Sequence, residues 1–157
     1  MAWDALHAYF IRAAKAHPER TAVEEIDGLC LTYKQLDGLS DRVRDRLRLW
    51  GVGPGDRVGL YMRKSIDAVA SMYGALKCGA AYVPVDPGAP AARDAFVLSD
   101  CAVRAVVVED GFAEGLRAAL ATLGKPVPRL LPIGEPGGGS AIAAALDRED
   151  REDPAPA

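Results

Sequence analysis

The chain has 157 residues, half of which are hydrophobic, with a formal net charge of −3 and a sequence pI near 5.4. This length is enough for one domain with a substantial buried core. The acidic balance leaves no excess of cations to neutralise phosphates, which argues against a nucleic-acid-binding protein.

Neither a targeting segment nor a disulfide pattern is apparent. Met1–Asp4 opens with an acidic residue, and no apolar run approaches the length of a membrane-spanning helix. We therefore expect a cytoplasmic protein that does not contact a membrane. Cys30, Cys78 and Cys101 are too few and too widely spaced for a disulfide framework or a zinc site, which favours free buried thiols.

The amino-terminal residues predict a helix followed by a hairpin. Proline disfavours a helical conformation in the residue before it, so the helix should end at His17-Pro18. Thr21–Ile26 and Leu29–Leu31 flank Asp27-Gly28, a two-residue turn that hairpins prefer. With only His7 besides His17, a metal site or a catalytic dyad is not predicted. The apolar positions of the helix are Trp3, Leu6, Phe10 and Ala13.

A second helix should begin at Thr32–Gln35, which has the form of a capping box. Its predicted buried stripe consists of Leu36, Leu39, Val43, Leu47 and Trp50. The remaining surface carries both signs of charge, on Asp41, Arg42, Arg44, Asp45, Arg46 and Arg48. Interleaved aspartates favour an ordinary solvated face over a phosphate-binding surface.

Two glycine-rich segments are candidates for phosphate loops. Gly51–Asp56 follows a helix and precedes a predicted strand, Arg57–Tyr61, whereas a dinucleotide loop must leave a strand and enter a helix. It is therefore interpreted as a helix cap and turn. Glu135–Ser140 has the right polarity but no accompanying lysine, so a small nucleotide-binding domain built on Gly137–Gly139 is the weakest alternative.

The centre of the chain predicts a helix that stops at a glycine and leads at once into a short strand. Ser65 can cap the helix, Gly79 can adopt the left-handed conformation at its end, and Pro84 limits the strand to a short run or an edge. Lys77, Cys78 and Asp86 have no histidine or second carboxylate nearby, so the unit is interpreted as architectural. Its predicted helical stripe is Ile66, Val69, Met72, Tyr73 and Leu76.

Further helices and strands alternate after the turn at Asp86–Pro90. The predicted elements are a helix at Pro90–Ser99, a strand at Val103–Val108, a helix at Phe112–Leu123, a strand at Leu130–Ile133 and a weak helix at Ala141–Leu146. Such alternation with short loops implies an α/β fold with a largely parallel sheet flanked by helices. We assign residues 1–146 to this subdomain and residues 147–157, charged and then Pro/Ala-rich, to a solvated linker.

The central unit also resembles a protein family. Leu76–Pro87, Leu-Lys-Cys-Gly-Ala-Ala-Tyr-Val-Pro-Val-Asp-Pro, is similar to the second core motif of the adenylate-forming, AMP-binding ligases, although the family usually has alanine where Cys78 stands. Leu31–Leu36 resembles the first core motif, Gly51–Val58 a characteristic turn, and Pro18–Val23 the usual lead-in. The likeness is strongest to the adenylation domain of a nonribosomal peptide synthetase or a related acid–carrier-protein ligase.

The resemblance implies an incomplete, amino-terminal part of the adenylate-forming ligase fold. The complete enzyme would use ATP and Mg2+ to activate a carboxylic acid, with amino acids favoured, and transfer it to a carrier-protein or CoA thiol. No residue here matches a catalytic, cofactor-binding or metal-binding position of the family, so none is assigned. The chain is expected to be inactive and to bind no cofactor alone, and to need the carboxyl-terminal remainder on the same or a separate polypeptide. The alternative is a non-catalytic binding or scaffolding module that retains part of the fold.

Overall fold

The computed structural model describes residues 5–134 and 140–152. Strands β4, β3, β5 and β6 form a parallel sheet in that order, and β1 pairs with β2 as a separate antiparallel hairpin. The predicted α/β fold with a largely parallel sheet is confirmed. The elements are α1 Leu6–Ala16, β1 Thr21–Glu24, β2 Cys30–Thr32, α2 Tyr33–Leu49, β3 Arg57–Tyr61, α3 Ile66–Lys77, β4 Ala81–Pro84, α4 Ala91–Asp100, β5 Ala105–Glu109, α5 Asp110–Thr122, β6 Arg129–Ile133 and α6 Ala141–Glu152.

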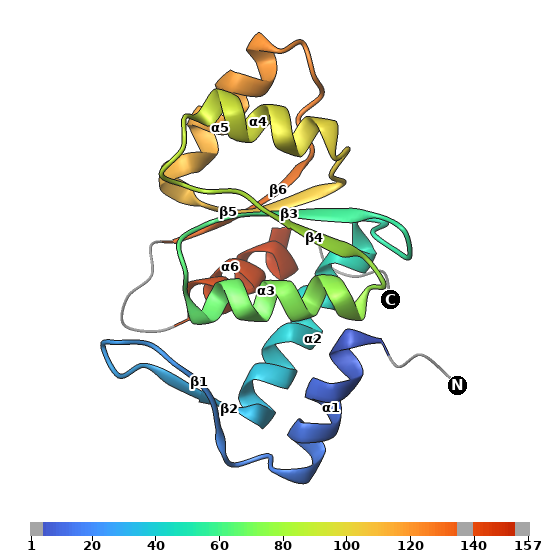
Figure 1. Cartoon of the computed structure of the whole chain (residues 1–157), viewed down its shortest axis with the longest axis vertical. Coiled ribbons are helices and arrows are strands. Elements are labelled where there is room, and N and C mark those ends of the chain that lie inside the picture. The colour runs from blue at the N-terminus through green and yellow to red at the C-terminus, as the bar shows by residue number, and fades with distance from the viewer. Residues whose placement is uncertain (1–4, 135–139, 153–157) are drawn as a thin grey trace.

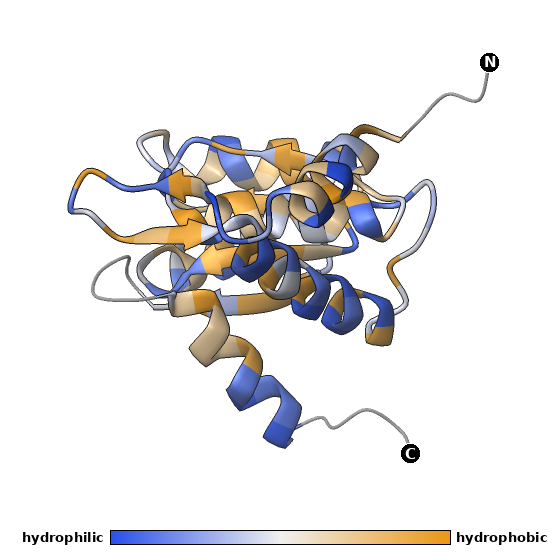
Figure 2. Ribbon diagram, turned by 90° about the horizontal axis from the view of Figure 1, so that it is seen from below, coloured by the Kyte–Doolittle hydropathy of each residue, from blue (hydrophilic) through white to orange (hydrophobic). Residues whose placement is uncertain are grey.

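The sheet separates two apolar clusters. Figure 1 shows α4 and α5 on one face and α3 and α6 on the other, with α2 and α1 successively farther from the sheet. Strand β5 is buried throughout. Val107 belongs to the cluster on the α3 face, and its neighbour Val106 belongs to the cluster on the α4 face. Figure 2 shows the strands as the hydrophobic centre, with hydrophilic residues on the surrounding helices. None of the described helices combines the length and apolar character needed to cross a bilayer.

The predicted caps and the predicted edge strand are confirmed. The Thr32 hydroxyl accepts a hydrogen bond from Gln35 N at 3.2 Å, while the Gln35 side chain accepts one from Thr32 N at 2.8 Å. Ser65 Oγ accepts from Ala68 N at 3.1 Å where α3 begins, and Gly79 has a φ of 80° just after it ends. Strand β4 lies at the edge of the sheet, as Pro84 predicts.

The buried face of α3 differs from the predicted stripe. Of that stripe only Ile66 is buried, and the most buried residues are instead small ones such as Ala70, Ser71 and Gly74. The reason is the close approach of α2, because a Cβ atom added to Gly74 would lie 2.5 Å from Val43 Cγ1. Hydrophobic spacing identifies large apolar residues, whereas closely packed helices bury small ones.

Helix α6 runs to Glu152, beyond the predicted end at Leu146, and so crosses the start of the predicted linker. Arg42 and Arg46 of α2 explain the extension, because they form ion pairs with Asp147 and Asp150. The side chain of Arg46 is 1% exposed, and its Nη2 lies 2.6 Å from Asp150 Oδ1. The predicted solvated face of α2 is therefore wrong for Arg46. Assignment of residues 147–157 to a linker stays a prediction.

Two glycines within helices should respond in opposite ways to the same substitution. Gly38 of α2 has no atom within 4 Å of an added Cβ, so Gly38→Ala should stabilise the fold by roughly 0.5–1 kcal/mol. Gly74→Ala places its methyl group against Val43 and should destabilise it by roughly 1–3 kcal/mol. Urea unfolding of both variants measures the difference. Equal changes in the free energy of unfolding would contradict the tight α2–α3 packing.

Candidate functional site

The order of the strands points to one edge of the sheet. The chain passes from β3 through α3 to β4, then returns across β3 through α4 to β5, so the direction of winding reverses between β3 and β5. Helices α3 and α5, which follow β3 and β5, accordingly lie on opposite faces (Figure 1). In open α/β sheets, ligands bind outside the carboxyl ends of the strands at such a reversal.

An open crevice lies at this point. It comprises two adjoining cavities of about 490 and 620 Å³, which share Arg63, Pro87 and Gly88. Glu109 and Phe112 border it from the β5–α5 side, and the β3–α3 and β4–α4 loops supply the remainder. We refer to these lining residues as the switch-point crevice.

Arg63 and Glu109 join the ends of β3 and β5 inside the crevice. The carboxylate of Glu109 accepts hydrogen bonds from Arg63 N at 2.8 Å and Arg63 Nε at 2.9 Å, and Arg63 Nη2 lies 2.9 Å away. The Glu109 side chain is 1% exposed, whereas that of Arg63 is about half exposed. A carboxylate engaged in this way is a brace between strands rather than a free general base or metal ligand.

A buried carboxyl group lies next to the crevice. Tyr61 stacks on Phe112 with ring centroids 5.2 Å apart, and it interacts electrostatically with Asp94 of α4. Asp94 is 2% exposed, and its Oδ2 has no hydrogen-bond partner among the described residues. Burial raises the pKa of Asp94, and it also raises the pKa of Tyr61. Asp94 thus favours the neutral form more than an exposed aspartate does.

Protein carboxylates also occupy two helix amino ends at this edge. Glu25 in the β1–β2 turn accepts a hydrogen bond from Ile66 N at 2.6 Å, at the start of α3. Asp67 is 3% exposed and accepts from Ser140 Oγ at 2.6 Å and Ala141 N at 2.9 Å, at the start of α6; its pKa is raised by burial. Helix amino ends can bind phosphate, but here internal acceptors take these amides.

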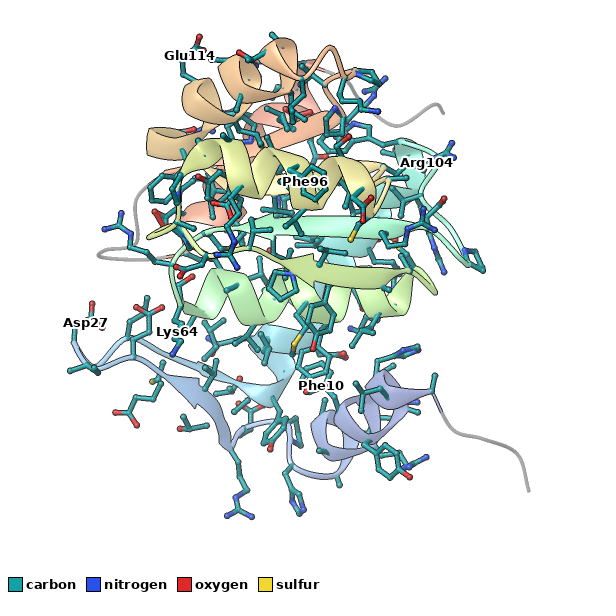
Figure 3. All side chains as sticks on the ribbon, turned by 45° about the horizontal axis from the view of Figure 1, so that its top comes forward. Phe10, Asp27, Lys64, Phe96, Arg104 and Glu114 are labelled. Carbon is teal, nitrogen blue, oxygen red and sulfur yellow. The ribbon has the colours of Figure 1, made fainter. Side chains whose placement is uncertain are left out.

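The hairpin adds another cavity at the same edge. This cavity measures about 500 Å³ and lies between the β1–β2 turn and the beginning of α3, with Asp27 and Lys64 on its walls. Figure 3 shows the labelled Asp27 at the hairpin tip and Lys64 in the loop after β3. Charges of both signs line it, so its chemistry does not single out an anionic or cationic ligand.

The polar environment of the central unit differs from the prediction, and its interpretation as architectural stays a prediction. Lys77 does have carboxylates nearby, with its Nζ 2.6 Å from Asp37 Oδ1 and 2.7 Å from Asp41 Oδ1, and its side chain is 3% exposed. Cys78 is buried, which raises the pKa of its thiol to about 11 and makes it a poor nucleophile. Asp86 accepts a hydrogen bond from Gly88 N within the turn after β4.

The histidines and the glycine-rich turn considered in the sequence lie apart from the crevice. His7 is on α1 and His17 is at its end, and the described residues contain no cluster of three or more histidine, cysteine or carboxylate side chains suited to a metal ion. Gly51–Asp56 forms the predicted cap and turn at the opposite edge of the sheet, before β3. Cys30 is exposed, so the prediction of buried thiols is wrong for it. The glycines at 137–139 lie outside the described residues.

No sequence motif singled out Arg63, Glu109 or Asp94. The first two are 46 residues apart, and only the order of the strands brings them together. A correct order of the strands would have indicated this pair, since polar residues at the carboxyl ends of neighbouring parallel strands meet at one edge of the sheet.

Comparison with known proteins identifies related sequences and structures. A family model described as AMP-binding enzyme matches residues 10–155. Syringomycin synthase SyrB1 from Pseudomonas syringae pv. syringae is 43% identical over 102 residues, which are 65% of this chain and 16% of that protein. The chain therefore spans about a sixth of this relative's length.

Solved structures of related proteins share the fold. The complex structure of VinN with L-aspartate has a TM-score of 0.77 and 26% sequence identity, and the match covers 95% of this chain and 35% of VinN. A Mycobacterium tuberculosis fatty acyl CoA synthetase has a TM-score of 0.72 and 30% identity, with 88% of this chain and 27% of that chain covered.

The brace at the crevice should contribute measurably to stability. Glu109→Gln removes the charge that holds Arg63, so it should lower the free energy of unfolding by roughly 1–3 kcal/mol. The matched control is Arg104→Met, which removes an exposed arginine 3.7 Å from Asp56 and should cost less than about 1 kcal/mol. Urea unfolding compares the two, and a cost no larger for Glu109→Gln would refute the bracing role.

Asp94 should make stability depend on pH. Because its pKa is raised in the folded protein, ionisation costs stability, and the folded state is favoured less as the pH rises from about 4 through that raised pKa. Asp94→Asn cannot ionise and should melt at a higher temperature than wild type at pH 7. The difference should shrink as the pH falls toward about 4. Thermal melts across this range test the prediction, and a difference that grew on acidification would have the wrong sign.

Proposed function

We propose that this chain, which belongs to the AMP-binding enzyme family, is the amino-terminal part of a ligase that uses ATP to activate a carboxylic acid as an acyl-adenylate. The match of the family model to residues 10–155 carries this proposal, and it confirms the resemblance predicted from Leu76–Pro87. We also propose a cytoplasmic location, because the reaction consumes ATP.

We infer that the acid is an amino acid and that the acceptor is a carrier-protein thiol. Two observations support this choice: the sequence Tyr82–Pro87, which leans toward amino-acid-activating members, and the 43% identity to a syringomycin synthase. A structural relative solved with L-aspartate is consistent with it. Likeness to a fatty acyl CoA synthetase supports the competing assignment, an acyl-CoA ligase.

The contacts at the carboxyl edge support a framework role for this chain rather than triphosphate binding. Attack on the α-phosphorus requires clustered cations and hydroxyl groups to stabilise developing negative charge. Here Arg63 is held by Glu109, and the amide of Ile66 is bonded to Glu25. We therefore assign ATP and Mg2+ binding, and the catalytic groups, to the carboxyl-terminal remainder of the enzyme. The present chain contributes the framework on which that remainder packs and is inactive alone.

Exposed apolar side chains support the existence of such a packing partner. Ile26 is fully exposed at the hairpin tip, while Leu6 and Tyr9 of α1 are 64% and 63% exposed. Burial of large apolar side chains would contribute about 25 cal/mol per Å² removed from water. The hairpin and α1 lie at the same end of the molecule, away from α4 and α5 (Figure 1).

Reconstitution tests the proposal. A separately produced polypeptide with the remaining parts of the domain should form a complex with this chain and restore carboxylate-dependent exchange of pyrophosphate into ATP. Neither piece alone should show exchange, because complex formation brings the framework and the ATP contacts together. Exchange should be measured with a panel of amino acids and fatty acids, so that the substrate class is tested separately.

Different results would contradict the amino-acid assignment and the framework role of this chain. Exchange only with fatty acids would retain the adenylating function and overturn the amino-acid assignment. Full activity of the second polypeptide alone would show that this chain is dispensable for catalysis, and the binding or scaffolding module would then be the better account. Fluorescence anisotropy of the labelled chain provides the control that a complex has formed.

A further inference from the structure

A second cleft lies at the edge of the sheet where the parallel strands begin, away from the switch-point crevice. Helices α4 and α5 run back from the carboxyl edge, and their last turns border a cavity of about 290 Å³. An adjoining cavity of about 400 Å³ shares two residues with it, Ser99 and Lys125. We call the two cavities together the α4–α5 groove. Combined cavities of this size fall in the range of small-molecule sites.

The first cavity of the groove is lined mainly by apolar residues, whereas Ser99, Asp100 and Lys125 make the second cavity more polar. Leu98 and Leu120 line the deeper cavity, and each is only 1% exposed. Phe96 and Leu123 border the outer cavity, with 60% and 40% of their surfaces exposed. Figure 3 shows Phe96 on the outer side of α4. A partly enclosed apolar cleft with few polar groups is the usual form of a ligand-binding site.

Two polar side chains in the groove have no partner of their own. The Ser99 hydroxyl and the Lys125 ammonium group form no hydrogen bond or ion pair with any described residue, although both line the two cavities. Lys125 is nevertheless held at the mouth through its backbone, because its N donates to Leu120 O at 3.0 Å. A hydroxyl group and a cation, from Ser99 and Lys125, therefore line a cavity that also contains Leu98 and Leu120.

The wall of the groove includes a strained residue. Ala102 has a φ of 48° and is the only non-glycine residue of the described chain with positive φ. Its conformation is held by hydrogen bonds from Ala102 N to Ser99 O and from Val103 N to Leu98 O. Glycine would relieve the strain but would remove the methyl group from the cavity wall. Ala102 therefore forms the left-handed cap that ends α4 before the chain enters β5.

We propose that the α4–α5 groove binds a small amphipathic carboxylate. Its apolar tail packs on Leu98 and Leu120, while its carboxylate accepts a hydrogen bond from the Ser99 hydroxyl and pairs with Lys125. Asp100 lines the outer cavity and opposes the anion, which limits affinity and directs the head group toward Lys125. The groove lies at the other edge of the sheet, away from the switch-point crevice.

Three compounds with one tail and different head groups test the proposal on the full 157-residue chain. Octanoate, 1-octanol and octylammonium should be titrated below their micellar concentrations and followed by amide NMR. Octanoate should shift signals of residues 96–103 and 120–128 and should bind more tightly than octanol, with octylammonium weakest. Acetate should bind at least tenfold more weakly than octanoate, because it lacks the tail.

Charge variants locate the head group. Lys125→Met should weaken octanoate binding about fivefold or more and leave octanol binding unchanged, whereas Asp100→Asn should strengthen octanoate binding about twofold. Arg117→Met removes an exposed arginine of α5 outside the groove and serves as the matched control, with no effect expected.

Several results would overturn the proposal. No octanoate binding, shifts centred elsewhere, equal affinity for octylammonium, or the same octanoate affinity in wild type and Lys125→Met would each do so. All variants alter exposed residues, and thermal melts establish that each remains folded.

Discussion

The close approach of α2 to α3 determines how the layer beneath the sheet is built. Gly74 allows the contact because Val43 occupies the space that a side chain would need. The same approach brings Lys77 of α3 within 2.6 Å of Asp37 and 2.7 Å of Asp41 of α2, so a buried cation has two carboxylate partners. Removing the contact would leave that cation buried and unpaired, which is costly. The register of the two helices is therefore specified by both shape and charge.

Helix α3, held in this way, presents its amino end at the carboxyl edge of the sheet, where ligands of α/β proteins usually bind. At this edge, however, three carboxylates form contacts within the protein. Glu109 joins β5 to Arg63 after β3, Glu25 joins the hairpin to α3, and Asp67 joins α3 to the start of α6. These contacts occupy amides and a cation that could otherwise bind phosphate. This arrangement suits a framework whose ATP contacts are supplied by another segment.

Local signals predicted much of the fold. The cap at Thr32, the left-handed Gly79 and the edge strand at Pro84 depend on neighbours in the sequence, and each was predictable. The end of α6 was not, because it depends on Arg46 and Asp150, which are 104 residues apart. The crevice was missed for the same reason: its brace exists only once β3 and β5 are adjacent. The family was predictable because its motifs are contiguous.

We propose that this chain provides a framework and that the groups that bind ATP lie in the remainder of the enzyme. Isothermal titration calorimetry of the isolated chain with ATP and Mg2+ tests it most directly. We expect no heat beyond that of dilution, because the Ile66 amide is bonded to Glu25 and Arg63 is bonded to Glu109 at the carboxyl edge. Saturable, magnesium-dependent ATP binding at micromolar concentrations, lost when the glycines at 137–139 are changed to alanine, would contradict it.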